Sequence, residues 1–80
     1  MATDMVHVGF KNFIAMNRVI AIASPKSAPI KRSIQDARDK ERLIDLTHGR
    51  RSKAVVFTDN GAIILTGLEA ETIVSRANTG

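Results

Sequence analysis

Three positively charged side chains lie within the five residues Gly49-Arg50-Arg51-Ser52-Lys53. A glycine before such a run favours a turn, and a turn carries long cationic side chains toward solvent. Guanidinium groups bind phosphate through charge-assisted, often bidentate hydrogen bonds and fit narrow DNA grooves. The segment therefore predicts contacts from Arg50, Arg51 and Lys53 to a nucleic-acid backbone, and the alternative is a solvated basic turn.

A further arginine, Arg18, stands immediately before the apolar run Val19-Ile20-Ala21-Ile22-Ala23. An arginine at the start of a strand is held close to the core, near loops that converge at the same end. Two interpretations remain open for this residue. It extends the basic surface, or it forms an ion pair with Asp45 or Asp59.

Residues that could support catalysis or metal binding are few. Asp45 and His48 are three positions apart, but no motif places a nucleophile or a further ligand beside them. The glycines form no phosphate-binding loop, and two His without any Cys leave little from which to build a zinc site. We predict no enzyme activity, no cofactor, no metal and no small-molecule substrate.

The charges are unevenly distributed along the chain. The net charge is +4, and residues 26–53 hold nine Lys or Arg against four Asp or Glu. A localised positive region in a small protein favours a polyanionic partner. Three Phe with no Trp or Tyr argue against stacking on single-stranded bases, so contact with the backbone of double-stranded DNA is the better candidate. No helix carries a row of base-reading side chains, so direct readout of the major groove is not supported.

The first half of the chain predicts two strands and a helix. Residues 5–10 alternate weakly and indicate a strand, followed by a loop through residues 11 and 12. Residues 19–23 are continuously apolar and β-branched, which is typical of a strand buried on both faces, with residues 13–16 leading into it. Ser27 is a good N-cap and Pro29 suits a first turn, so a helix is expected from there to about Glu41.

The second half predicts a further strand, a hairpin and a short helix. Residues 43–47 alternate as in a half-buried strand. Residues 54–58 and 62–66 flank Asp59-Asn60-Gly61, which predicts a β-hairpin whose Asn-Gly pair takes positive φ angles. Residues 68–76 have acidic residues at the front and apolar ones behind, which favours a closing helix, and residues 77–80 are expected to fray.

These elements make one α+β domain over residues 1–77, with a disordered tail at 78–80. The expected architecture is a small, mostly antiparallel sheet covered on one face by a central helix and a short C-terminal helix. Because 80 residues without Cys supply little core, self-association is expected to add stability and to cover sheet edges. The longest strictly apolar run is five residues and no signal peptide is visible, so we expect a soluble, cytoplasmic protein without a membrane partner.

Several segments, taken in order along almost the whole chain, resemble the bacterial extracellular matrix regulator RemA family. The Ser-Ala-Pro-Ile-Lys-Arg segment followed by Gly-Arg-Arg is the most specific part of this resemblance. The similar segments are Val8-Gly9-Phe10, Asn17-Arg18-Val19-Ile20-Ala21-Ile22, Ser24-Pro25, Ser27-Ala28-Pro29-Ile30-Lys31-Arg32, Leu43-Ile44-Asp45 and Gly49-Arg50-Arg51 with Ala54-Val55.

The resemblance implies a DNA-binding transcription regulator that assembles into closed rings, in a family associated with extracellular matrix and biofilm regulation. The DNA-contacting arginines of the family match Arg18, Arg50 and Arg51. Three positions depart from the family pattern: Lys11 replaces a Gly in a loop expected near Arg18, His48 replaces a Tyr, and Ala70 replaces a Pro. The identity of the regulated genes does not transfer with the resemblance.

The leading hypothesis is therefore a homo-oligomer that binds duplex DNA by backbone contact and DNA shape. Two alternatives stay open. The same basic surface could bind RNA, or the protein could be a structural oligomer in which arginines such as Arg18 form salt bridges between subunits.

Overall fold

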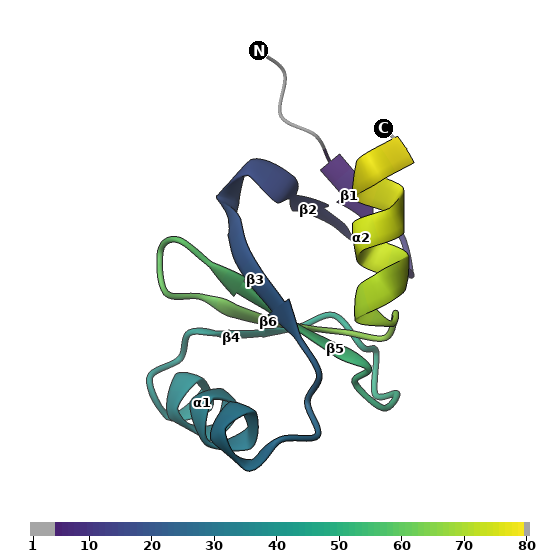
Figure 1. The fold of residues 1–80 in the computed structure, drawn as a ribbon. Coiled ribbons are helices and arrows are strands. Elements are labelled where there is room, and N and C mark those ends of the chain that lie inside the picture. Colours follow the sequence, from purple (N-terminus) through teal and green to yellow (C-terminus); the bar gives the residue numbers. More distant parts are fainter. Residues whose placement is uncertain (1–4, 80) are drawn as a thin grey trace.

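A computed structural model of the chain describes residues 5–79 (Figure 1). The described residues form six strands, two α-helices and one 3-10 helix, in the order β1 (Met5–His7), β2 (Phe13–Ala15), η1 (Met16–Arg18), β3 (Val19–Ala23), α1 (Ala28–Asp39), β4 (Leu43–Asp45), β5 (Ala54–Thr58), β6 (Ile63–Thr66) and α2 (Ala70–Thr79).

The strands form a two-stranded sheet, β1-β2, and a four-stranded sheet in the order β3-β5-β6-β4. The β3–β5 and β5–β6 pairs are antiparallel, whereas β4 runs parallel to β6. The predicted α+β class is confirmed. The larger sheet is mixed because β4 joins it from outside the hairpin and pairs with the second hairpin strand.

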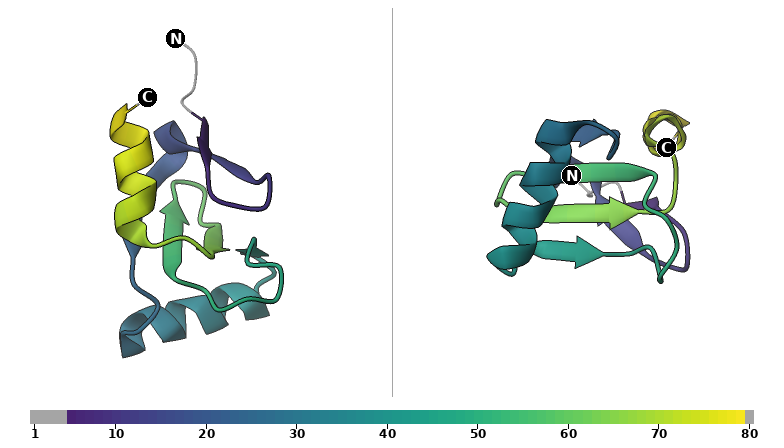
Figure 2. Two further views of the ribbon diagram at one scale, coloured as in Figure 1. Left: turned by 90° about the vertical axis from the view of Figure 1, so that its right-hand side faces the viewer. Right: turned by 90° about the horizontal axis from the view of Figure 1, so that it is seen from below.

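The helices cover opposite faces of the four-stranded sheet (Figures 1 and 2). Val55, Ile63 and Leu65 pack with Ala37 of α1, whereas the alternate residues of β5 and β6 pack with Ile73 of α2 and with the β1-β2 hairpin. The prediction of helices on one face is therefore wrong. Both central strands are apolar at successive positions, so both faces of the sheet need a cover.

The N-terminal segment differs from the prediction. Residues 13–16 do not lead straight into the next strand, because β2 pairs with β1 as a separate antiparallel hairpin with Val6 opposite Ile14. Both of these side chains are buried, and η1 then redirects the chain into β3.

The prediction that β3 is buried on both faces is wrong, because β3 is an edge strand of the sheet. Its register shifts between Val19 and Ala21, and Ile20 at this bulge is 70% exposed. The opposite edge is β4, where Ile44 is 45% exposed.

Helix α1 begins where its cap predicts. Ser27 precedes the helix in an extended conformation, and its hydroxyl accepts a hydrogen bond of 3.3 Å from the Ile30 amide, while Pro29 lies in the first turn. The helix ends at Asp39 and not at Glu41, because Glu41 adopts a left-handed conformation with φ of +59°.

The hairpin of β5 and β6 is confirmed, but its turn differs in detail. Gly61 alone has a positive φ, of +90°, among the three turn residues. The Asn60 side-chain oxygen instead accepts hydrogen bonds from the Ala62 amide at 3.1 Å and the Thr58 hydroxyl at 2.6 Å. Asn60 therefore organises the turn through its side chain and not through its backbone.

Helix α2 starts at Ala70 and continues to Thr79, three residues beyond the predicted end. Gly80, the last residue of the predicted tail, lies outside the described residues. Over residues 5–79, neither helix is long and apolar enough to cross a membrane.

Candidate nucleic-acid interface

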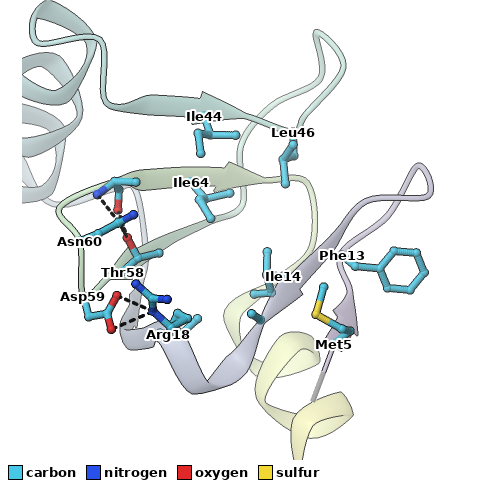
Figure 3. A pocket seen from close by; sticks show the side chains of 13 residues that line it. Met5, Phe13, Ile14, Arg18, Ile44, Leu46, Thr58, Asp59, Asn60 and Ile64 are labelled. Atoms are coloured by element: carbon cyan, nitrogen blue, oxygen red, sulfur yellow. Dashed lines mark hydrogen bonds and ion pairs between the residues drawn. The ribbon is translucent and has the colours of Figure 1, made fainter. Parts of the chain in front are cut away.

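Arg18 ends η1 and pairs with a carboxylate in the hairpin turn. Its Nε atom donates to both carboxylate oxygens of Asp59 at 2.9 Å, and the two side chains are 57% and 45% exposed (Figure 3). Of the two possible partners, the structure places Asp59, and not Asp45, beside Arg18. The pair lies within one chain. Because only Nε is engaged among the described residues, the two terminal nitrogens remain available to a further acceptor.

Arg50 lies in the loop between β4 and β5 and is held over an aromatic ring. Its guanidinium carbon is 5.4 Å from the centre of the Phe10 ring, which is a cation–π distance. Its backbone amide donates to the Thr47 carbonyl at 3.0 Å. Arg50 is therefore exposed and yet held in place by contacts at both its backbone and its side chain.

The ring under Arg50 belongs to a strained loop between β1 and β2. Phe10 and Lys11 have φ angles of +52° and +63°, a conformation that costs about 1–2 kcal/mol for a residue with a side chain. The Phe10 ring lies 4.6 Å from the His48 ring, and the Asn12 side-chain amide is 3.3 Å from His48 Nε2. The loop that carries Lys11 thus contacts the His48–Arg50 turn, and the expectation that it lies near Arg18 is wrong.

Asp45 anchors the start of the loop that carries Arg50. One of its carboxylate oxygens accepts hydrogen bonds from the Thr47 hydroxyl at 2.5 Å and from the Thr47 amide at 2.8 Å. These hydrogen bonds lower the pKa of Asp45 below its ordinary value of 3.8, since they favour the charged form. Thr47 is itself buried, so the base of the loop is fixed while its tip stays exposed.

Arg51 and Lys53 have other neighbours than Arg50. They line a groove of about 590 Å³ together with Lys26 and Lys31, and the start of α2 contributes the acidic side chains of Glu69 and Glu71. We refer to this as the basic groove.

The four predicted contact residues therefore have three different surroundings on one subunit. Arg18 lies beside Asp59, Arg50 lies over Phe10, and Arg51 and Lys53 share the basic groove. Sequence reasoning missed Phe10 as the support of Arg50, because it placed this residue at the end of the first strand, whereas β1 ends at His7. The preceding Gly9 was a usable signal for an earlier turn.

Asp45 and His48 each contact other residues of the loops around them. The carboxylate of Asp45 bonds to Thr47, and the His48 ring contacts Phe10 and Asn12. Within the part of the chain that the structure describes, no three His, Cys, Asp or Glu side chains are grouped so as to hold a metal ion.

Comparison with known proteins identifies the family. Residues 5–77 match the model of the RemA-like family, described as extracellular matrix regulatory protein A-like. A protein of Dehalococcoides mccartyi strain BAV1 is 59% identical over 95% of this chain and 79% of its own length. A protein of Trichormus variabilis is 51% identical over 95% of this chain and 86% of its own length, and one of Brevibacillus brevis is 48% identical over 99% and 92%.

All three relatives are provisionally named as regulatory proteins, and neither these names nor that of the family refers to an enzyme. The match of the family model to nearly the whole chain and the high identity of these relatives agree with each other. The chain therefore belongs to the RemA-like family of extracellular matrix regulatory proteins.

Proposed function

We propose that this protein is a DNA-binding transcription regulator that acts as a homo-oligomeric ring. In this proposal duplex DNA contacts Arg18, Arg50, Arg51 and Lys53 of successive subunits. The proposal also places the protein in the bacterial cytoplasm, where the chromosome is. Membership of a family named for regulation supports it.

The main observation in support of the proposal is that contacts fix the position of the Arg50 side chain. Its guanidinium lies 5.4 Å from the Phe10 ring centre, and no carboxylate pairs with it among residues 5–79. An arginine that serves only the fold or solubility does not need an aromatic support on a strained loop. A positioned, exposed guanidinium without a carboxylate partner suits a phosphate oxygen, to which it donates two parallel hydrogen bonds.

Self-assembly is supported by apolar surface at both edges of the four-stranded sheet. Ile20 on β3 and Ile44 on β4 are exposed at opposite edges, and neither edge has a further strand among the described residues. Beside Ile44 lies an apolar groove of about 460 Å³, whose walls include Met5, Phe13 and Ile64 (Figure 3). Unlike surfaces at opposite edges favour head-to-tail contacts, which close into a ring when the rotation between subunits permits it.

A ring compensates for the modest charge of one subunit. A net charge of +4 per chain is small, but copies side by side repeat each arginine at a regular interval. Several weak contacts to one DNA molecule then act together, because each later contact forms at a high effective concentration. Contact of this kind reads the backbone and shape of DNA and needs no base-reading helix.

The test is duplex DNA binding across a salt series, on protein whose solution mass has been measured. We expect wild-type protein to bind as an oligomer and its affinity to fall steeply with salt. Each phosphate that Arg50→Ala no longer neutralises should reduce the slope of log affinity against log salt by about 0.9. Arg38→Ala, which removes an exposed arginine of α1, is the matched control.

Equal slopes for Arg50→Ala, Arg38→Ala and wild type would contradict the proposed contacts. Dissociation of the Arg50→Ala oligomer would instead assign this arginine to subunit assembly. Tighter binding to structured RNA than to duplex DNA of equal length would indicate that RNA is the ligand.

A further inference from the structure

The basic groove collects cations from segments that are far apart in the sequence. Lys26 follows β3 and Lys31 lies in the first turn of α1, whereas Arg51 and Lys53 precede β5. Along α1 itself, basic side chains alternate irregularly with the acidic Asp36 and Asp39. The fold places Lys31 of that helix, together with Lys26 just before it, beside the Arg51–Lys53 segment.

These four cations are not neutralised within the part of the chain that the structure describes. The ion pairs found there join Arg18 to Asp59 and Lys40 to Asp36, and neither pair involves the groove. The first turn of α1 has no acidic residue that could offset Lys31. Glu69 and Glu71 line the same groove without pairing with its lysines or arginine, so the groove keeps a positive excess.

We propose that Lys26 and Lys31 are further phosphate contacts of the DNA-binding surface, and that the basic groove receives a phosphate of the DNA backbone. This inference rests on the proposed function and extends it to residues outside the predicted arginines. Arg51 supplies a bidentate donor, and the lysines supply mobile point charges that adapt to the path of the backbone. A phosphate here would meet four cationic side chains from three segments.

The two glutamates make the part of the groove next to α2 acidic. Glu71 lies in the first turn of α2 and Glu69 directly precedes that helix, and their carboxylates repel phosphate oxygens. The DNA backbone is therefore expected to lie against the side of the lysines and Arg51. Neutral replacements of the glutamates should remove this repulsion and strengthen binding.

The experiment compares charge-matched double variants in the duplex DNA titration. For each phosphate that it no longer neutralises, Lys26→Ala/Lys31→Ala should lower affinity by about eight-fold at about 0.1 M salt and flatten the salt slope by about 0.9. Lys40→Ala/Arg42→Ala removes the same charge near the other end of α1 and should leave the slope unchanged. Glu69→Gln/Glu71→Gln should bind more tightly than wild type.

The outcomes separate this inference from the proposed function. If wild type binds duplex DNA and Arg50→Ala flattens its salt slope, but the groove variant behaves like its control, the groove inference is wrong and the proposed function stands. If wild type does not bind duplex DNA, the proposed function itself fails. Binding of inorganic pyrophosphate that is lost in the groove variant, without any change in DNA affinity, would assign the groove to a free anion and overturn its role in DNA binding.

Discussion

Glu41, the second residue after the end of α1, offers a quantitative test of backbone strain in this fold. Glu41 has a φ of +59°, its amide donates to the Arg38 carbonyl at 3.2 Å, and the Arg42 amide donates to the Ala37 carbonyl at 2.8 Å. This is the hydrogen-bond pattern of the Schellman cap, in which glycine usually occupies the left-handed position. We therefore expect Glu41→Gly to stabilise the protein.

The size of the effect follows from two opposing terms. A side chain in the left-handed conformation costs about 1–2 kcal/mol, and glycine avoids that cost. Glycine also makes the unfolded chain more flexible, which lowers the free energy of unfolding by about 0.5–1 kcal/mol. With the middle of each range, the net gain in the free energy of unfolding is about 0.75 kcal/mol, which corresponds to about 3–6 °C in Tm for a chain of this length.

The assay is thermal and urea unfolding, followed by circular dichroism, of wild type, Glu41→Gly and Glu41→Ala. The alanine variant removes the same charge near the negative end of the helix but keeps the Cβ atom, so it isolates the electrostatic part of any gain. Measurements at several protein concentrations are needed because self-association raises apparent stability. If alanine stabilises the protein as much as glycine does, the gain comes from charge and the strain argument is refuted.

Three further predictions follow from the core, the loop and the ion pair. Ile73→Ala should lower the free energy of unfolding by about 2–5 kcal/mol in urea titrations, because Ile73 is fully buried, whereas the exposed neighbour Val74→Ala should cost under about 1 kcal/mol. The pKa of Asp45 is lowered in the folded state, so its stabilising contribution is complete above its ordinary value of 3.8 and is lost as pH falls below that value. Urea unfolding at neutral pH and at about pH 2.5 should therefore show that acid lowers the free energy of unfolding less for Asp45→Asn than for wild type. An equal decrease in both proteins would contradict this. Asp59→Asn should release Arg18 and raise duplex DNA affinity by about two- to five-fold, the equivalent of one exposed ion pair, and unchanged affinity would mean that Arg18 does not contact DNA.

Elements with strong local signals were predictable from the sequence. Ser27 and Pro29 marked the start of α1, and Asn60-Gly61 marked the hairpin, because caps and turns depend on a few neighbouring residues. The end of α1 was misplaced because Glu41 occupies a position where glycine is the usual signal. The strand β2 was missed because three residues carry no periodicity of their own, and their pairing with β1 is a contact between separate segments.

Burial and spatial grouping were less predictable. The apolar run around Ile20 suits a strand buried on both faces and also an edge strand, so its composition could not distinguish them. The exposure of Arg50 and Arg51 followed from the glycine turn before them. The support of Arg50 by Phe10 depends on residues 40 positions apart, which only the fold brings together.

Strand β6, like its neighbour β5, contributes side chains to both hydrophobic clusters. In β6, Ile63 and Leu65 point into the cluster under α1, while Ile64 points into the cluster under α2. Inserting or deleting one residue in this strand would reverse its facing pattern and disrupt both clusters at once. The two layers should consequently melt in a single transition, and evolutionary change in either layer is constrained by the needs of the other.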